Sequence, residues 1–249
     1  MVHYSFDYSQ QVLYPHYAQQ VGKLFFKTPR KCGCFGVCCE SSRTQIVYLL
    51  DEAVGKSVGK GANSVVSMVH HHFTHLAYGE KRAMLHMDNC VGQNKNNTVI
   101  GYGMWRVMRG LHKEIEFSLM EAGHTKFSPD WHFGLWKVKW RASNAETLEE
   151  VADTVRKSSR VGYNIPQITS SHPGTVFLRE YADNQEVAIE ITRPQRQPIP
   201  SSDMPERIDN QELDAKRSWY LFEEIAPLCN NSSACSKPTV PKPSSGVRL

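Results

Sequence analysis

The chain has 249 residues, of which 40% are hydrophobic and 22% charged, and its formal net charge is +4. These values are typical of a globular protein with a sizeable core. No apolar run approaches the length that crosses a bilayer, and the first residues, MVHYSFDYSQQ, lack the pattern of a secretory signal. Seven cysteines, an odd number, argue against a disulfide framework. The sequence therefore predicts an intracellular protein with no membrane partner.

The charge is unevenly distributed along the chain. Residues 1–142 hold 17 Lys and Arg against 10 Asp and Glu, a balance of +7, whereas the remainder holds 12 against 15. A basic first part indicates an anionic partner, and we expect that partner to be DNA.

The first half of the chain shows strand patterns. VHYSFDY (2–8) alternates, with Val2, Tyr4 and Phe6 on one face, and KLFFKT (23–28) is expected to form a second strand. A third strand is expected in CGCFGVCCE or TQIVYLL, where periodicity does not separate one long hairpin from two short strands.

From Ala62 the periodicity becomes helical and then alternates between strand and helix. Val65, Val69, Phe73 and Leu76 recur at helical spacing, and an apolar strand follows at 82–88. A helix over 100–111, weakened by Gly101 and Gly103, a strand over 114–121 and a helix over 128–142 complete the series.

Three strands, helix, strand, helix, strand, helix is the element order of the ribonuclease H-like fold. It predicts an α/β domain with a mixed five-stranded sheet flanked by helices, in which the first and fourth strands are parallel neighbours. We assign this core to residues 1–142 and a small C-terminal α+β extension to 143–228, consisting of a helix, a hairpin (TVFLREY and EVAIEIT), a linker and a helix. Residues 229–249, rich in Ser and Pro, are expected to be disordered.

Three aspartates fall at points that this topology brings together. Asp7 lies near the end of the first strand, Asp88 ends the fourth, and Asp130 is in the first turn of the last helix. Three carboxylates suit two Mg²⁺ or Mn²⁺ ions, which would assist phosphodiester displacement. His124 precedes the third carboxylate and is a candidate proton carrier. Each aspartate also has a structural interpretation: Asp88 as a turn residue, Asp130 as a helix N-terminal charge and Asp7 as a solvent-facing strand residue.

Three further clusters have weaker patterns. VGKSVGKGANS follows a strand but lacks the spacing of a phosphate-binding loop, so no nucleotide cofactor is expected. The cluster of four cysteines at Cys32, Cys34, Cys38 and Cys39 lacks paired Cys-x-x-Cys knuckles; a buried strand is the favoured interpretation and a zinc-stabilised module the alternative. The histidines of 70–75 are interpreted as a polar helical face.

Five strings carry a resemblance to one family: FDYSQQVLYP, TPRKCGCFGVCCE, GKGANSVVSMVHHHF, HMDNCVGQNKNN and GHTKFSPDWHFG. Over residues 3–142, and more weakly as far as RSWYLFEEI, the chain resembles a group of transposon-derived animal proteins with DNCxGQNKN and GHTKFxPD motifs. That group is similar to transposases of the DDE/DDD class, which have the ribonuclease H-like fold.

The resemblance implies the same acidic residues, Asp7, Asp88 and Asp130, with His124 in the GHT motif. It also implies that residues around Asp88 and His124 form the rim of the site and orient ligands or contact nucleic acid: Asn89, Gln93, Asn94, Lys95 and Lys126. Two departures are the start of the chain close to the first strand and a short stretch between 157 and 175, which suggest a truncated copy.

Two hypotheses follow. The first is a transposase-derived domain, ancestrally a metal-dependent enzyme of DNA cleavage and strand transfer, located in the nucleus and able to form a homo-oligomer. The second is a domesticated, catalytically silent protein that binds DNA or another protein.

Overall fold

The computed structural model describes residues 1–19, 22–53, 59–121, 127–169, 177–178, 206–207, 213–230 and 243. A six-stranded mixed sheet with the order β5-β4-β1-β2-β3-β6 forms the centre of the molecule. Its strands are β1 (Val2–Tyr14), β2 (Arg30–Cys39), β3 (Thr44–Asp51), β4 (Arg82–Met87), β5 (Glu114–Leu119) and β6 (Asn164–Thr169). Two further short strands, β7 (Phe177–Leu178) and β8 (Glu206–Arg207), pair with each other.

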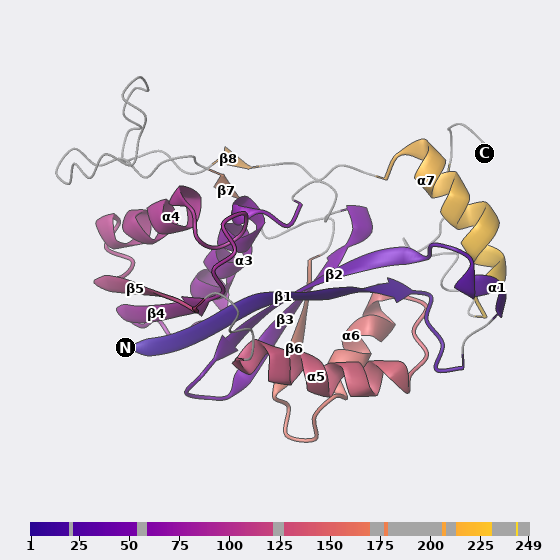
Figure 1. Cartoon of the computed structure of the whole chain (residues 1–249), viewed down its shortest axis with the longest axis horizontal. Helices are drawn as coiled ribbons and strands as arrows, with labels where there is room; N and C mark the ends of the chain where they lie inside the picture. Colours follow the sequence, from indigo (N-terminus) through magenta and orange to yellow (C-terminus); the bar gives the residue numbers. More distant parts are fainter. Residues whose placement is uncertain are drawn as a thin grey trace.

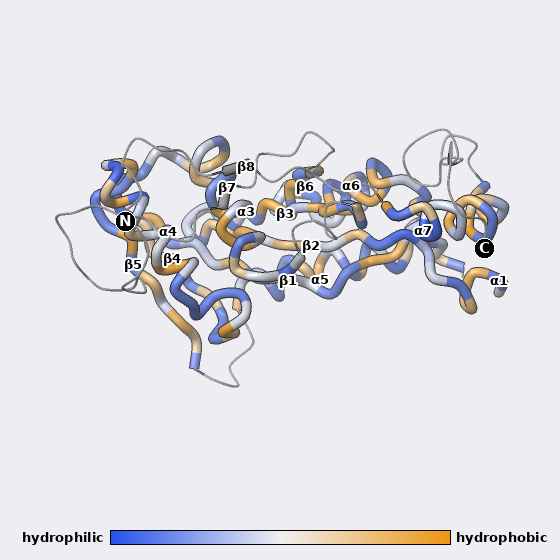
Figure 2. The backbone as a smooth tube through the Cα atoms, turned by 90° about the horizontal axis from the view of Figure 1, so that it is seen from above, coloured by the Kyte–Doolittle hydropathy of each residue, from blue (hydrophilic) through white to orange (hydrophobic). Residues whose placement is uncertain are grey.

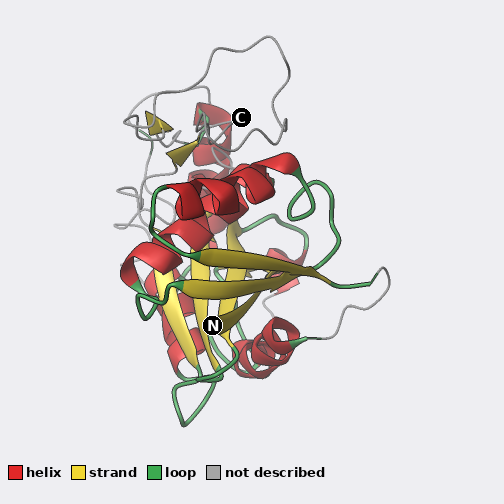
Figure 3. Cartoon of the chain, turned by 90° about the vertical axis from the view of Figure 1, so that its left-hand side faces the viewer, coloured by secondary structure: helices red, strands yellow, loops and turns green. Residues whose placement is uncertain are grey.

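The directions of the strands follow from their connections. β1, β2 and β3 are consecutive antiparallel neighbours. The helical crossovers make β4 parallel to β1, β5 parallel to β4, and β6 parallel to β3. The expected parallel pairing of the first and fourth strands is therefore confirmed, and Figure 3 shows the twisted sheet with helices on both sides.

Four helices cover the two faces of the sheet. α3 (Ala62–His75) and α4 (Asn97–Met108) lie on one face, and α5 (Ser128–Arg141) and α6 (Leu148–Arg156) lie on the other, above and below the strands in Figure 1. The short α1 (Gly22–Phe25) and the C-terminal α7 (Ala215–Tyr220), η1 (Leu221–Ile225) and η2 (Ala226–Leu228) meet at the far end of the sheet.

β1 contributes side chains to two hydrophobic cores, one on each face of the sheet. Tyr4 and Phe6 are buried under α3 and α4 together with Phe35, Val69 and Phe73. Figure 2 shows the resulting interleaving of apolar and polar stretches along the strands. Burial of these large side chains, at roughly 1.5–3 kcal/mol each, is the main force that holds the first layer of helices.

On the opposite face, α5 and α6 pack with their aromatic and branched residues against β2 and β3. Trp136 is fully buried, and its indole Nε1 donates to Thr154 Oγ1 of α6 at 2.8 Å. His132 Nδ1 lies 2.9 Å from Asn164 Oδ1 at the start of β6, and the Asn164 amide nitrogen donates back to the His132 carbonyl at 3.1 Å. These polar contacts join α5, α6 and β6 into one unit.

The expected sheet of five strands was wrong in its count, because β6 adds a sixth strand beside β3. β6 comes from the segment that we assigned to a C-terminal extension, so that segment completes the main sheet instead of standing apart. Its Pro166 has no N–H and obscures the strand pattern, but β6 is an edge strand, where proline is tolerated.

The expected strand at residues 23–28 was also wrong. Part of it forms α1, and Phe25 and Phe26 are 65% and 87% exposed. This apolar run has no neighbouring strand to pair with, whereas both candidate segments after it, residues 30–39 and 44–51, form a hairpin. The predicted hairpin at 175–192 lies almost wholly outside the described residues, although Phe177 and Leu178 pair with residues 206–207. Of the expected disordered tail, only residues 229, 230 and 243 are described.

In the described part of the chain, no helix has the length and apolar character needed to cross a membrane.

Two glycines of α4 give a matched test of the packing. A Cβ on Gly103 would lie 2.4 Å from Phe117 Cζ of β5, whereas a Cβ on Gly101 would meet no heavy atom within 4 Å. We expect Gly103→Ala to lower the free energy of unfolding by about 1–3 kcal/mol, and Gly101→Ala to raise it by about 0.5–1 kcal/mol. Urea denaturation measures both values. Equal effects of the two substitutions would contradict this packing of α4 on β5.

Candidate active site

The register of β1 and β4 aligns Asp7 with Asp88. The last paired residues are Ser5 of β1 and His86 of β4, and two positions further along each strand lie Asp7 and Asp88. Because successive side chains alternate between faces, residues at the same offset in parallel strands point to the same face. Asp88 directly follows the end of β4, while β1 continues to Tyr14. The two carboxylates therefore lie on one face of neighbouring strands.

That face is the one covered by α5. Asp7 pairs across the sheet with Gly36 of β2, and a Cβ on Gly36 would lie only 2.8 Å from Phe133 Cζ of α5. Asp130 lies in the first turn of α5, and its N–H donates to the Phe127 carbonyl at 3.1 Å. The N-terminal end of α5 thus approaches the edge at which β4 ends.

A glutamate positions the start of α5 against β1. Glu40 accepts hydrogen bonds from the hydroxyl groups of Ser5 and Ser128, the latter at 2.7 Å. The ring of Phe127 packs edge-on against the ring of His86, with centroids 5.8 Å apart. These contacts fix the helix end relative to both strands that carry the aspartates.

The pKa of Asp7 depends on its burial and on the other two aspartates. Burial is the largest cause that raises the pKa of Asp7, from 3.8 to about 7. The Tyr8 N–H, which donates to Asp7 Oδ1 at 2.7 Å, acts in the opposite direction. The negative charges of Asp88 and then Asp130 add to the rise. Asp7 therefore lies within electrostatic range of both other aspartates selected from the sequence.

Asp88 is held by its own loop. Its Oδ1 accepts the Cys90 N–H at 3.0 Å and the side-chain amide of Asn94 at 2.6 Å. The structural interpretation of Asp88 as a turn residue is therefore correct for Oδ1, and Oδ2 makes no hydrogen bond within the described residues. Asp130 likewise occupies the favourable position for a negative charge at a helix N-terminus. Structural roles for these two residues leave carboxylate oxygens available.

The amide-rich rim divides into residues with different roles. Asn94 is 3% exposed and orients Asp88, and its Oδ1 has no hydrogen-bond partner in the described structure; the same holds for Asn89 Oδ1. Gln93 is half-buried and Lys95 is exposed. Asn96, which the sequence did not single out, caps α4 through the Thr98 and Val99 N–H groups. His124 and Lys126 lie outside the described residues.

The donor set suits a hard divalent cation, but the ligands are not gathered round one point. Three carboxylates on one face are the oxygen donors that Mg²⁺ and Mn²⁺ prefer. Within the described ranges, no group of three or more His, Cys, Asp or Glu side chains is arranged to hold a metal ion.

Sequence reasoning missed Gln45 of β3. This residue is fully buried, and neither its Oε1 nor its Nε2 has a hydrogen-bond partner in the described part of the chain. Its side chain lies over Gly36, where a Cβ would come within 2.7 Å of Gln45 Cδ. Gly36 is the cross-strand partner of Asp7. The sequence gives no indication that a glutamine in a strand is buried next to a candidate site without hydrogen-bond partners.

The cysteine cluster follows the favoured interpretation of a buried strand. Cys32 and Cys34 belong to the core beneath α5 and α6, whereas Cys39 belongs to the core beneath α3 and α4. Cys39 cannot share one metal ion with Cys32 and Cys34, because the sheet separates them.

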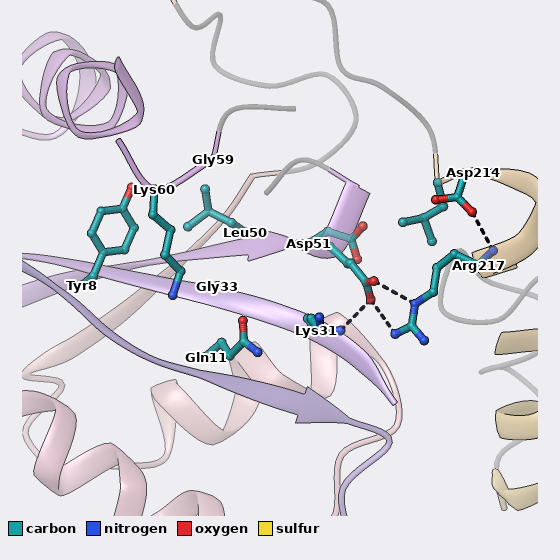
Figure 4. Close-up of a pocket in the computed structure, with 12 residues that line it drawn as sticks. Tyr8, Gln11, Lys31, Gly33, Leu50, Asp51, Gly59, Lys60, Asp214 and Arg217 are labelled. Atoms are coloured by element: carbon teal, nitrogen blue, oxygen red, sulfur yellow. Dashed lines mark hydrogen bonds and ion pairs between the residues drawn. The ribbon is translucent and has the colours of Figure 1, made fainter. Parts of the chain in front are cut away.

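A cavity lies between β1, β2, β3, the residues just before α3, and α7 (Figure 4). Lys60 extends over the strands near Tyr8 and Gln11, with its Nζ 5.7 Å from the Tyr8 ring centroid. At the other end, Arg217 pairs with Glu52 at 2.8 Å and donates to the Thr28 and Pro29 carbonyls. The arginine thus ties α7 to the sheet, which is a structural role.

The raised pKa of Asp7 predicts a pH-dependent stability. The folded protein keeps the Asp7 proton up to about pH 7, while the unfolded chain releases it near 3.8. Stability from this group is therefore greatest below about pH 4 and falls as the pH rises to 7. Asp7→Asn should remove this slope, as measured by urea denaturation between pH 4 and 7.

Two controls accompany this prediction. Asp153→Asn, in an exposed ion pair of α6, should leave the slope unchanged. Asp88→Asn should lower the pKa of Asp7 by removing a neighbouring negative charge, which carbon NMR of the Asp7 carboxyl group detects. A pKa of Asp7 that Asp88→Asn leaves unchanged would refute the proximity of these two carboxylates.

The comparisons with known proteins give a family without an assigned activity. No curated protein and no solved structure matches the chain. The family described as "Domain of unknown function (DUF7869)" matches residues 34–188, which include Asp88 and Asp130, most of β2 and the whole of β3, β4, β5 and β6. Because this match covers more than half of the sequence, the chain belongs to the DUF7869 family.

Proposed function

We propose that this protein is a transposase-derived domain with a ribonuclease H-like fold, whose ancestral activity is metal-dependent cleavage and strand transfer of DNA phosphodiesters. The observation that carries the proposal is the placement of Asp7 and Asp88 on one face of neighbouring strands, with Asp130 of α5 within electrostatic range of Asp7. The basic charge of residues 1–142 supports a DNA substrate, and a protein that acts on DNA would be expected in the nucleus.

The strand order supports the proposed fold class. Five strands run β3-β2-β1-β4-β5, with β2 antiparallel to its neighbours and β4 and β5 parallel to β1. This is the arrangement that the element order of the sequence predicts for a ribonuclease H-like core. β6 extends it at the β3 edge.

The residues of the chain would perform distinct tasks. Asp7, Asp88 and Asp130 would hold the divalent cations, which when bound stabilise the charge that develops on the phosphate. Asn94 fixes Oδ1 of Asp88, and Oδ2 makes no hydrogen bond within the described residues. Asp7 must lose its proton to become a ligand, because burial and two neighbouring charges keep it protonated up to about pH 7. Lys95, exposed beside Asp88, is placed to contact a phosphate of the DNA.

Metal binding is the first test. Titration with Mn²⁺ should broaden the NMR signals of residues beside all three aspartates, and titration with Mg²⁺ at pH 6.5 should release a proton from Asp7. Asp88→Asn should weaken both effects by about tenfold or more, since it removes a charged ligand. Asp153→Asn, the same chemical change on the exposed surface of α6, should leave both effects unchanged. Unchanged signals at millimolar Mn²⁺ would exclude the metal site.

Activity is the second test. With Mg²⁺ or Mn²⁺ present, the full chain should cleave or join DNA, and Asp88→Asn should abolish that reaction, while Asp153→Asn retains it. Loss of a metal-coordinating carboxylate typically removes several kcal/mol of transition-state stabilisation, which is readily measured on a labelled duplex.

The catalytically silent protein is the alternative, and one observation favours it. The carboxylates are not arranged as a coordination shell within the described residues. DNA binding that is independent of Mn²⁺ and unaffected by Asp88→Asn, with no strand cleavage, would establish this alternative over the first.

A further inference from the structure

A buried arginine without an acidic partner lies on the opposite face of the sheet. Arg106 of α4 is 4% exposed, and no carboxylate pairs with it in the described part of the chain. Burying a charge is costly unless an opposite charge compensates it. A guanidinium in this state is unusual among structural arginines, which are either exposed or paired with a carboxylate.

Neutral groups hold the guanidinium in place. Arg106 Nε donates to His112 Nδ1 at 3.1 Å, and Nη1 donates to Tyr102 Oη at 3.0 Å, with His70 Nδ1 3.3 Å away. The guanidinium carbon lies 4.8 Å from the ring centroid of Phe73. Nη2 makes no hydrogen bond within the described residues. The side chain is therefore fixed, with one of its nitrogens still available.

The surrounding histidines orient Arg106 without neutralising its charge. Burial, and then the charge of Arg106, lower the pKa of both His70 and His112 to about 4. Both are neutral at pH 7, so His112 accepts from Arg106 through Nδ1 and carries its proton on Nε2. The buried His112 Nε2 also lacks a partner in the described structure. The interpretation of the histidines of 70–75 as a polar helical face was therefore wrong for two of them. His70 contacts the buried Arg106, and His72 is itself buried.

Arg106 lines a cavity of about 470 Å³ between α3, α4 and the start of β4. The charged residues that line it are Lys81, Arg106, Arg109 and Glu80, and the histidines are neutral. Lys81 directly precedes β4, and His112 lies two residues before β5. The cavity is thus at the end of the parallel strands opposite to Asp88 and beneath the other layer of helices.

We propose that this cavity is a binding site for a phosphate dianion, either free or as a terminal phosphate of a small molecule. A planar guanidinium held on two sides offers the directed N–H groups that recognise phosphate oxygens. Lys81 adds a second cation at the exposed rim, which favours an anion in the cavity. The bound phosphate supplies the opposite charge that Arg106 lacks, and Nη2 and His112 Nε2 become its donors.

The test uses inorganic phosphate and the full chain. Calorimetry and NMR of the His70, His112 and Trp105 side chains should detect saturable one-to-one binding of phosphate, and acetate should bind more weakly. Sodium chloride at matched ionic strength should have no saturable effect. Glucose 6-phosphate and inorganic phosphate distinguish a small-molecule ester from the free ion, since the larger ligand binds more tightly only where its sugar contacts the cavity.

Three variants complete the design. Arg106→Met should weaken phosphate binding by about tenfold or more and keep the fold, because methionine replaces a buried uncompensated charge with an apolar side chain. Lys81→Ala, at the exposed rim, should weaken binding several-fold with no loss of thermal stability. Lys113→Ala removes the same charge from an exposed residue outside the cavity and should leave binding unchanged.

Phosphate binding that Arg106→Met and Lys81→Ala both leave intact would overturn the proposal. So would equal responses to phosphate and chloride, or the absence of saturable binding by a folded protein at tens of millimolar phosphate. If Arg106→Met fails to fold, Lys81→Ala and Lys113→Ala still decide the question. None of these results depends on the aspartates, so this site and the proposed nuclease site stand or fall separately.

Discussion

The parallel pairing of β1 with β4 is the constraint on which the rest of the structure depends. Its register sets Ser5 beside His86 and hence aligns Asp7 with Asp88 on one face. A slip of one residue would turn every side chain of β4 to the opposite face. It would move Leu85 and Met87 out of the core beneath α3 and α4, so burial of these residues also fixes the positions of the two carboxylates.

The candidate site imposes a cost that the surrounding packing offsets. Burial, and then repulsion of the ionised form by the charges of Asp88 and Asp130, raise the pKa of Asp7 to about 7. Glu40 adds a fourth acidic side chain at the start of α5, where two serine hydroxyl groups satisfy it. The fully buried Trp136 and the paired His132 and Asn164 hold α5 on the sheet despite this repulsion. These contacts in the middle of α5 hold Asp130, in its first turn, within electrostatic range of Asp7.

How much of this could be read from the sequence depends on how local the signal is. Periodicity identified β4, α3 and α5, because their apolar residues repeat at the spacing of a strand or helix that faces one core. It failed for β6, where Pro166 breaks the pattern on an edge strand, and for Phe25 and Phe26, whose apolar run has no partner strand. The aspartates were predictable because strand ends have fixed places in the topology. The roles of Gln45 and Arg106 were not predictable. What is unusual about these residues is that they are buried without the usual polar or charged partners in the described structure, and this depends on the three-dimensional packing.

The two proposed sites lie at opposite ends of β4 and on opposite faces of the sheet. Lys81 and the cavity of Arg106 are at its start, beneath α3 and α4, and Asp88 is at its end, on the side of α5. The buried residues of β4, Ala83, Leu85 and Met87, belong to the core beneath α3 and α4 and separate the cavity of Arg106 from the opposite face of the sheet. The pKa of Asp7 is raised by burial and then by Asp88 and Asp130, whereas the pKa of His112 is lowered by burial and then by Arg106. The charges of each site therefore act on their own neighbours, and one short strand positions both sites because successive side chains of a strand face opposite sides of the sheet.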